Sequence, residues 1–292
     1  MKVAIYSRHL EENQWNDVQL FLGELEKQQI ETVFYQGFLE QILPRIPLNE
    51  SPATFSQAEH LTEDIDFLIS FGGDGTLLDT VTLVRNSGIP VMGINFGRLG
   101  FLAGIGRDEL STAVRALVRR TYVIDRRTLI HLDASLPLFG QVPYGLNEFA
   151  IHKRDTEPMI KIHTYLNGEF LNTYWSDGLI VATPTGSTGY SLSCSGPIVF
   201  PESGSFVITP VAPHNLNVRP IVIPDDQIIS FEIESRSDQV ICALDSRREI
   251  VSKDVQLAVR KESFPFNLVR LNENNFLQTL HNKLTWGLDK RN

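Results

Sequence analysis

The residues with the clearest chemical potential in this sequence form the segment Gly72-Gly73-Asp74-Gly75-Thr76, directly after the apolar run 67–71. The pattern predicts a buried strand that ends in glycines and is followed by a helix that begins near Thr76. Such a turn presents backbone N–H groups and the positive end of the helix dipole to phosphate. Asp74 is the only charged side chain of the segment. We expect it to hold a metal ion, take a proton or bind a hydroxyl, and each role occurs in phosphoryl transfer.

A structural interpretation of this segment stays open from the residues alone. The glycines would supply positive φ angles at an ordinary strand-to-helix turn, and Asp74 would cap the helix N-terminus. That interpretation does not account for a second segment of similar character, residues 176–191, where another apolar run ends in small residues.

The second segment is rich in hydroxyl groups, which suit close contact with sugars, phosphates or a base edge. Tyr190, near its end, offers a ring to pack on another ring and a hydroxyl for a ribose. A Ser/Thr turn cluster between two strands is the structural alternative. The hydroxyl side chains belong to Thr183, Thr185, Ser187, Thr188 and Ser191.

These segments, together with others in the same order along the chain, resemble the NAD kinase family. The first glycine loop alone also resembles phosphofructokinases and lipid kinases, whereas the ordered set is highly specific and covers most of the chain. The remaining matching motifs are Leu146-Asn147-Glu148, Asp177-Gly178, Thr185 through Ser191, Pro213-His214, Arg219-Pro220 and Leu244-Asp245-Ser246.

The resemblance implies ATP-dependent phosphorylation of NAD at the 2′-hydroxyl of its adenosine ribose, which gives NADP. A ribose hydroxyl is a poor nucleophile, so Asp74 is implied as the catalytic proton acceptor or orienting acceptor. The backbone of Gly72, Gly73 and Gly75 would cradle the donor phosphates, while Mg²⁺ neutralises the transferring group. No protein ligand to the metal is assigned.

The resemblance also implies the dinucleotide contacts. Asn147 and Glu148 would bind through adenine and ribose, Asp177 would lie near the nicotinamide half, and residues 188–193 would line the adenosine side. His152, His163 and His214 are expected to be surface or packed histidines. The full implied cofactor-binding set is Gly72, Gly73, Gly75, Thr76, Asn147, Glu148, Asp177, Thr185, Ser187, Thr188, Gly189, Tyr190, Ser191, Ser193, Ala212 and Arg247.

Two residues depart from the family pattern. Trp175 stands where members usually carry a small or basic residue that borders the acceptor, and Arg247 stands where many bacterial members have glutamine. Trp175 would either reach the nicotinamide or pack in the core of its domain, and we predict the core for a tryptophan on a strand. The preference between NAD and NADH and any regulation by NADP stay open.

The N-terminal part alternates strand and helix patterns, which predicts a Rossmann-like parallel α/β domain over residues 1–121. Ligands collect at the carboxyl ends of such strands. A long loop is expected over 43–55. The predicted elements are strands at 3–6, 30–35, 66–71 and 91–95 and helices at 15–29 and 77–86.

From about Tyr122 the pattern changes to short, alternating runs, which predict a β-rich, sandwich-like domain over 122–270. Asn167-Gly168 is a hairpin signal. A second long loop is expected at 136–143, and a helical spacing returns at 273–284. By resemblance, residues 271–292 pack back on the first domain, and the β-rich domain forms homodimers or homotetramers. Strands are predicted at 159–165, 221–223, 228–233 and 255–259.

Composition limits the possible partners. A formal net charge of −9 over 292 residues argues against nucleic acid and anionic membranes, both of which need clustered Lys and Arg. No apolar run is long enough to span a bilayer, and the start reads as a strand, so we expect a soluble cytoplasmic protein. Cys194 and Cys242 are expected to be ordinary thiols, although one disulfide is compatible with the sequence.

Two other functions stay open from the sequence. The first is a related kinase that acts on a lipid or a sugar, although the composition shows no membrane-facing patch. The second is a dinucleotide-binding sensor without catalysis. The presence of Asp74 argues against a sensor, because binding alone does not need a base there.

Overall fold

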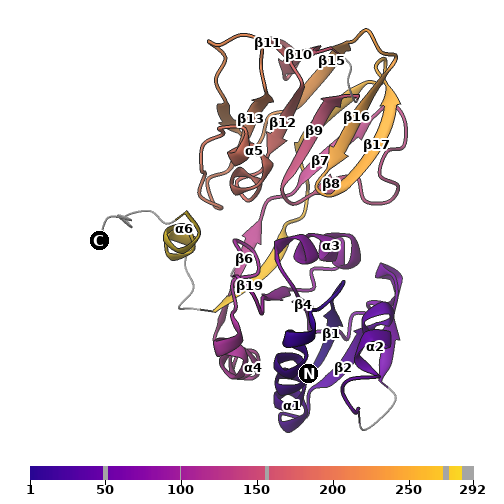
Figure 1. Cartoon of the computed structure of the whole chain (residues 1–292). Coiled ribbons are helices and arrows are strands. Elements are labelled where there is room, and N and C mark those ends of the chain that lie inside the picture. The colour runs from indigo at the N-terminus through magenta and orange to yellow at the C-terminus, as the bar shows by residue number, and fades with distance from the viewer. Residues whose placement is uncertain (49–51, 99, 155–157, 272–275, 285–292) are drawn as a thin grey trace. The chain divides into compact units, whose positions relative to one another are not determined.

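The computed structural model describes residues 1–48, 52–98, 100–154, 158–271 and 276–284. It divides into two compact units, one of residues 1–126 and 267–292 and the other of residues 127–266 (Figure 1). The predicted combination of a parallel α/β region and a β-rich region is confirmed. We call the two parts the α/β unit and the β-rich unit.

A seven-stranded sheet forms the centre of the α/β unit, in the order β3-β2-β1-β4-β5-β19-β6. The pairs joining β3, β2, β1, β4, β5 and β19 are parallel. The strands are β1 (Lys2–Tyr6), β2 (Glu31–Tyr35), β3 (Ala53–Phe55), β4 (Phe67–Phe71), β5 (Val91–Ile94), β6 (Tyr122–Arg127) and β19 (Phe266–Leu271).

Alternating side chains divide the core of this unit between the two faces of its sheet. Val3, Ile5, Phe67, Ile69 and Phe71 join one apolar cluster with buried residues of the first, second and fourth helices. On β5, an ideal Cβ at Gly93 would lie 2.6 Å from Leu77 Cδ1, so the third helix packs closely there. The helices are α1 (Trp15–Lys27), α2 (Gln36–Ile42), α3 (Asp74–Val84), α4 (Leu110–Arg119) and α6 (Phe276–Leu284).

The β-rich unit is built from two six-stranded sheets. Their orders are β11-β10-β15-β18-β7-β8 and β14-β13-β12-β9-β16-β17. Both sheets contribute to one apolar core, as expected for a sandwich. The strands are β7 (Ile130–Ala134), β8 (Tyr144–Gly145), β9 (Glu148–Lys153), β10 (Ile160–Leu166), β11 (Glu169–Ser176), β12 (Gly178–Ala182), β13 (Ser205–Val211), β14 (Ile221–Pro224), β15 (Ile229–Glu234), β16 (Gln239–Leu244), β17 (Arg247–Ser252) and β18 (Leu257–Lys261).

Three details differ from the expected elements, and one expected segment is described only in part. Residues 122–126 and 267–270 belong to the α/β unit, because β6 and β19 join its sheet. The expected loop 43–55 ends in β3, which pairs with β2. Helix α3 begins at Asp74, three residues before the expected start. Of the expected C-terminal segment 271–292, residues 272–275 and 285–292 lie outside the described residues, while the Phe276 ring of α6 lies 6.4 Å from the Phe101 ring in the same unit.

Candidate active site

The glycine loop of the α/β unit connects β4 directly to α3. Gly72 has a φ of 139°, and an ideal Cβ there would lie 2.5 Å from Thr76 Oγ1, so the turn requires glycine. Gly73 is the N-cap residue, and Asp74 is the first residue of the helix. The structural alternative in which Asp74 caps the helix is therefore wrong.

The first amides of α3 are available to a ligand by the geometry of any helix. The N–H groups of Asp74 and Gly75 have no partner within the helix, and the helix dipole adds positive potential at the same end. The Thr76 N–H instead donates to the Gly73 carbonyl at 3.0 Å, and the Gly72 N–H, which was expected to face a phosphate, donates to the Ile94 carbonyl at 2.9 Å. Gly75 is exposed, with nothing within 4 Å of an ideal Cβ. The loop thus offers the backbone donors and the open space that a phosphate group needs.

The Asp74 carboxylate points to a second loop, which follows β5. Its Oδ2 accepts the N–H of Phe101 at 2.8 Å. Its Oδ1 accepts the N–H of Leu102 at 3.1 Å and that of Ala103 at 2.9 Å. An ideal Cβ at Gly100 would lie 1.7 Å from Oδ1, so only glycine lets the loop approach this closely. We call these contacts the Asp74 cradle.

The Asn147–Glu148 pair lies where β9 begins, in the β-rich unit. Strand β9 lies between β12 and β16, with Glu148 opposite Ala182 and Phe149 opposite Leu244. The loop after β12 closes over the pair, because the Asn147 carbonyl accepts the Thr183 N–H at 2.8 Å. The Thr183 hydroxyl donates to the Leu146 carbonyl at 2.6 Å.

Two glycines of that loop bring it against the pair. An ideal Cβ at Gly186 would lie 2.0 Å from the Asn147 carbonyl oxygen. At Gly189 it would lie 3.3 Å from Glu148 Oε2 and 3.5 Å from Asn147 Nδ2. The polar ends of both side chains therefore converge on the Gly189 backbone, where α5 (Tyr190–Ser193) begins.

Glu148 has a strongly perturbed acidity. Burial of its carboxyl group is the main cause, and the charge of Asp245 adds to it, so the pKa of Glu148 rises to about 8. The Tyr190 backbone N–H acts in the opposite direction. At neutral pH the Glu148 carboxyl group is therefore mostly protonated. It can donate one hydrogen bond to a ligand and accept another.

A third group of polar residues surrounds Tyr190. Its ring lies 5.6 Å from the His152 ring, and Asp177 pairs with Lys153 at 3.0 Å. Burial, followed by the charge of Arg248, lowers the pKa of His152. His152 thus packs against Tyr190, as the interpretation of a packed histidine predicts.

The comparisons with known proteins agree over the whole chain. Residues 18–122 match the ATP-NAD kinase N-terminal domain, and residues 146–271 match the ATP-NAD kinase C-terminal domain. A NAD kinase of Cytophaga hutchinsonii is 47% identical over 100% of both chains, and one of Bacteroides fragilis is 40% identical over 100% of both. The chain belongs to the NAD kinase family. It is therefore an enzyme that phosphorylates NAD with ATP.

Two solved structures share the fold of this NAD kinase. Yeast NADH kinase complexed with NADH has a TM-score of 0.85 at 23% identity, over 99% of this chain and 89% of that one. A NAD kinase from Archaeoglobus fulgidus in complex with ATP has a TM-score of 0.75 at 25% identity, over 98% and 99% of the two chains.

The hydroxyl groups expected in the NAD kinase site mostly bond within the protein. Ser187 donates to the Pro184 carbonyl, Ser191 bonds Thr209, and both residues are fully buried. Thr188 donates to the Thr185 carbonyl at 3.1 Å, and Arg127 donates to the Thr185 hydroxyl at 3.2 Å. These groups shape the loop, whereas Ser193 and Ala212 are exposed.

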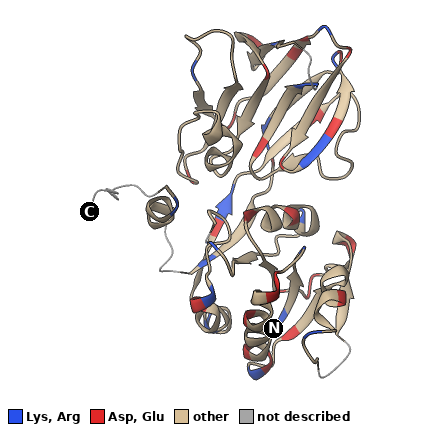
Figure 2. Ribbon diagram, viewed as in Figure 1, with Lys and Arg blue, Asp and Glu red and all other residues tan. Residues whose placement is uncertain are grey.

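Arg247 is half-buried and contacts the segment that precedes the Asn147–Glu148 pair. It begins β17 with Arg248, the blue segment at the start of that strand in Figure 2. Its guanidinium donates to the carbonyls of Val142 and Tyr144 and lies over the Phe139 ring. Arg247 therefore supports the chain that leads into Asn147 and Glu148.

The prediction that Trp175 packs in the core is wrong. Its side chain is 46% exposed, because β11 is an edge strand of its sheet. The indole stacks on the His214 ring with centroids 4.2 Å apart. His214 is exposed and His163 is half-buried, bonded to Thr173 and Glu234.

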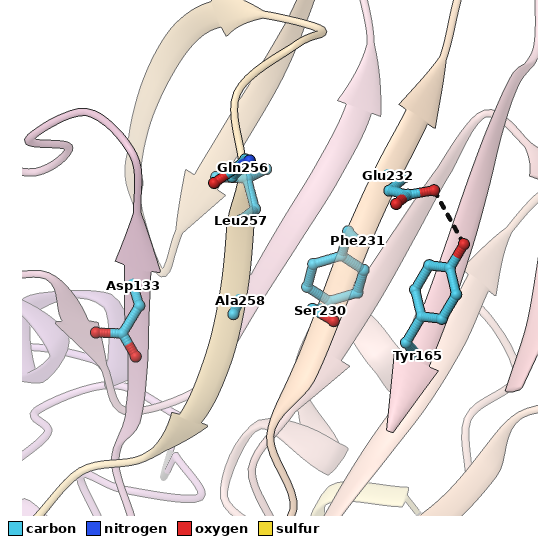
Figure 3. A pocket seen from close by; sticks show the side chains of 8 residues that line it. All are labelled: Asp133, Tyr165, Ser230, Phe231, Glu232, Gln256, Leu257 and Ala258. Atoms are coloured by element: carbon cyan, nitrogen blue, oxygen red, sulfur yellow. Dashed lines mark hydrogen bonds between the residues drawn. The ribbon is translucent and has the colours of Figure 1, made fainter. Parts of the chain in front are cut away.

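A separate pocket of about 390 Å³ lies on the sheet that contains β10 and contains none of the expected site residues. Figure 3 shows its lining side chains on neighbouring strands, including Tyr165, whose hydroxyl donates to Glu232 at 2.9 Å. Within the described residues, no three His, Cys, Asp or Glu side chains are grouped to hold a metal ion. No described helix is long and apolar enough to cross a membrane.

Proposed function

We propose that the enzyme transfers the γ-phosphoryl group of ATP to the 2′-hydroxyl of the adenosine ribose of NAD, with Asp74 as the acceptor for the hydroxyl proton. The Asp74 cradle is the observation that carries this proposal. A carboxylate offers about four lone-pair positions, and the cradle uses three of them. Since Oδ2 accepts only Phe101 among the described residues, it can take one further hydrogen bond, here from the ribose hydroxyl.

The cradle also gives Asp74 a defined direction. Three backbone donors fix the carboxylate, so no side-chain entropy is lost when the hydroxyl arrives. The hydroxyl is thereby oriented for in-line attack, and its proton has an acceptor as the new P–O bond forms. Asp74 is thus an orienting acceptor first and a base during the reaction.

The glycine loop is our proposed site for the phosphates of ATP. Gly73 and Gly75 place backbone N–H donors, and Thr76 a hydroxyl, at the N-terminus of α3, whereas the Gly72 N–H donates to the Ile94 carbonyl and the Thr76 N–H to the Gly73 carbonyl. Mg²⁺ usually binds to one or two carboxylates plus substrate phosphates, so we propose that it binds together with the ATP phosphates at this loop. Bound there, the ion would supply charge neutralisation on the transferring group.

For the dinucleotide, we propose the surroundings of Gly189. The Asn147 amide has one donor and one acceptor for an adenine edge, and the protonated Glu148 carboxyl can both donate to and accept from a ribose. Asp177, Tyr190, Ser193 and Ala212 would complete the contacts. Asn147 and Glu148 carry most of this proposal, because their polar ends converge on Gly189.

We also propose a homo-oligomer formed through the β-rich unit, working in the cytoplasm. The edge strand β11 supports an interface, because it exposes Trp175 and, at 58%, Phe170. Light scattering at working concentration tests this proposal, and an active monomer would refute it.

The test of the proposed function is an incubation with ATP, Mg²⁺ and NAD. The product is read by mass and by an NADP-specific dehydrogenase, which detects phosphorylation only at the 2′ position. Parallel reactions contain NADH, a sugar or a lipid as the acceptor. We expect NADP from NAD. Product only from the sugar or lipid would support the related kinase, and tight NAD binding without product would support the sensor.

A further inference from the structure

Asp245 lies in the turn between β16 and β17 and is not among the residues assigned to the site. Its backbone adopts a φ of 52°, which holds the side chain against the start of β9. Oδ2 accepts the Leu146 N–H at 2.7 Å, while Oδ1 accepts the N–H of Asn147 at 2.7 Å and of Glu148 at 3.1 Å. The Asp245 N–H donates to the Glu148 carbonyl at 3.0 Å. We call these contacts the Asp245 cradle.

The cradle fits only because a glycine precedes the three donors. An ideal Cβ at Gly145 would lie 2.9 Å from Asp245 Oδ1. On the opposite side, Thr183 and Gly186 contact the Asn147 carbonyl. The backbone of the pair is therefore fixed from two sides, and the directions of its side chains follow from that.

We propose that Asp245 is a positioning residue for the dinucleotide, which aims the Asn147 and Glu148 side chains at Gly189 by fixing the backbone of residues 146–148. This inference rests on the proposed role of the Asn147–Glu148 pair. It adds a residue that touches no substrate but on which that pair depends.

The charge of Asp245 supports the same role. After burial, this charge is the second cause of the raised pKa of Glu148. Among the described residues, Tyr190 and Cys194 also interact electrostatically with the Glu148 carboxyl. Removing the charge of Asp245 should therefore move the ionisation of Glu148 to lower pH.

The test compares Asp245→Asn with Asp225→Asn in the full-length enzyme. Asp225 is the control, because it is a buried aspartate of the same β-rich unit and pairs with Lys261 at 2.8 Å. We expect Asp245→Asn to raise KM for NAD about 10- to 100-fold, with kcat and KM for ATP changed less than about threefold. The inflection near pH 8 in KM for NAD should move to lower pH.

Asp225→Asn should lower the melting temperature by about as much as Asp245→Asn does, but it should leave KM for NAD unchanged. Equal KM values in the two variants, or an unmoved inflection, would overturn the proposal. If Asp245→Asn does not fold, Gly145→Ala keeps the carboxylate but displaces it, and a normal KM for NAD there would also overturn the proposal. If the wild type forms no NADP, the proposed function has failed. Calorimetric titration of each protein with NAD then still decides the role of Asp245.

Discussion

The Asp74 cradle and the Asp245 cradle use one device in two different units. In each, a carboxylate accepts the N–H groups of three consecutive residues, 101–103 or 146–148. In each, the residue before the three donors is a glycine whose Cβ would collide with the carboxylate. Three hydrogen bonds to one carboxylate fix the loop backbone without help from secondary structure, because charge-assisted hydrogen bonds are stronger than neutral ones.

The two cradles differ in what surrounds the carboxylate. Both aspartates are half-buried, but Asp74 lies at the start of α3, beside the glycine loop. At Asp245, desolvation of the carboxyl group raises its pKa although three backbone donors oppose this. The comparison teaches that backbone coordination alone does not make a residue catalytic. We propose that the position of Asp74 beside the glycine loop gives it that role.

The largest expected effect belongs to Asp74→Asn. The amide keeps the size of the side chain but removes the proton acceptor, so kcat should fall roughly 10²–10⁴-fold. Because three backbone hydrogen bonds are also disturbed, we expect a loss of about 1–3 kcal/mol in the free energy of unfolding. Steady-state kinetics and urea denaturation measure the two quantities. A folded variant with nearly normal kcat would remove Asp74 from the reaction.

Gly100→Ala separates the shape of the Asp74 cradle from its chemistry. The new methyl group would displace the loop but leave the carboxylate, so we expect a smaller loss in kcat, about 10- to 100-fold. Gly104→Ala is the matched control, since nothing lies within 4 Å of its ideal Cβ. If Gly100→Ala loses as much kcat as Asp74→Asn, loop geometry alone explains the role of Asp74.

The parts of the molecule that depend on local pattern were predictable from sequence. The strand before Gly72, the glycine loop and the β-rich half followed from periodicity and composition. Short edge elements such as β3 were missed, because three residues carry too little pattern. Helix α3 begins earlier than expected, at Asp74, with Gly73 as its N-cap residue.

Contacts across long sequence separations were not predictable. Asp74 meets residues 27 to 29 positions away, and Asp245 meets residues 97 to 99 positions away. No local sequence pattern connects either aspartate with its backbone donors, although a glycine, Gly100 or Gly145, precedes each set of donors. Trp175 was placed wrongly because its burial depends on whether β11 is a central or an edge strand, which the sequence of β11 does not state.

Glu148→Gln tests the electrostatics around the second cradle. The pKa of Glu148 is about 8 in the folded protein against 4.5 as the ordinary value, so the folded state retains a proton over that interval. The stabilisation from this proton is full below about pH 4.5 and is lost as the pH rises to about 8. Glutamine cannot ionise, so the variant should escape this loss.

Between pH 5 and pH 9 the free energy of unfolding of the wild type should therefore fall by about 1–3 kcal/mol more than that of Glu148→Gln. This is less than the full pKa shift implies, because Glu148 is half-buried and solvent screens its charge. Urea denaturation at pH 5, 7 and 9 measures the difference. Glu169→Gln, at an exposed carboxyl of the same unit, is the control. Parallel stability profiles of wild type and Glu148→Gln would contradict the assignment.

The smallest expected effect is that of Trp175→Ala. Since the indole is nearly half exposed, its loss should cost about 1 kcal/mol of stability and not the 3–5 kcal/mol of a core tryptophan. If the indole meets the cationic nicotinamide, NAD binding should weaken by about 0.5–2 kcal/mol, with less change for NADH. Phe170→Ala, an exposed aromatic on the same strand, is the control. An unchanged ratio of kcat/KM for NAD and NADH excludes the acceptor-site role.

The most direct test of the account is a single-turnover experiment with Asp74→Asn and Asp245→Asn side by side. Each enzyme is mixed with saturating ATP, Mg²⁺ and NAD, quenched at intervals and assayed for NADP. We predict that Asp74→Asn forms NADP roughly 10²–10⁴ times more slowly than wild type, and that Asp245→Asn, once saturated, stays within about threefold of it. Equal slowing in both variants, or a normal rate in Asp74→Asn, would contradict the proposal that Asp74 accepts the proton and Asp245 only positions the dinucleotide-binding residues.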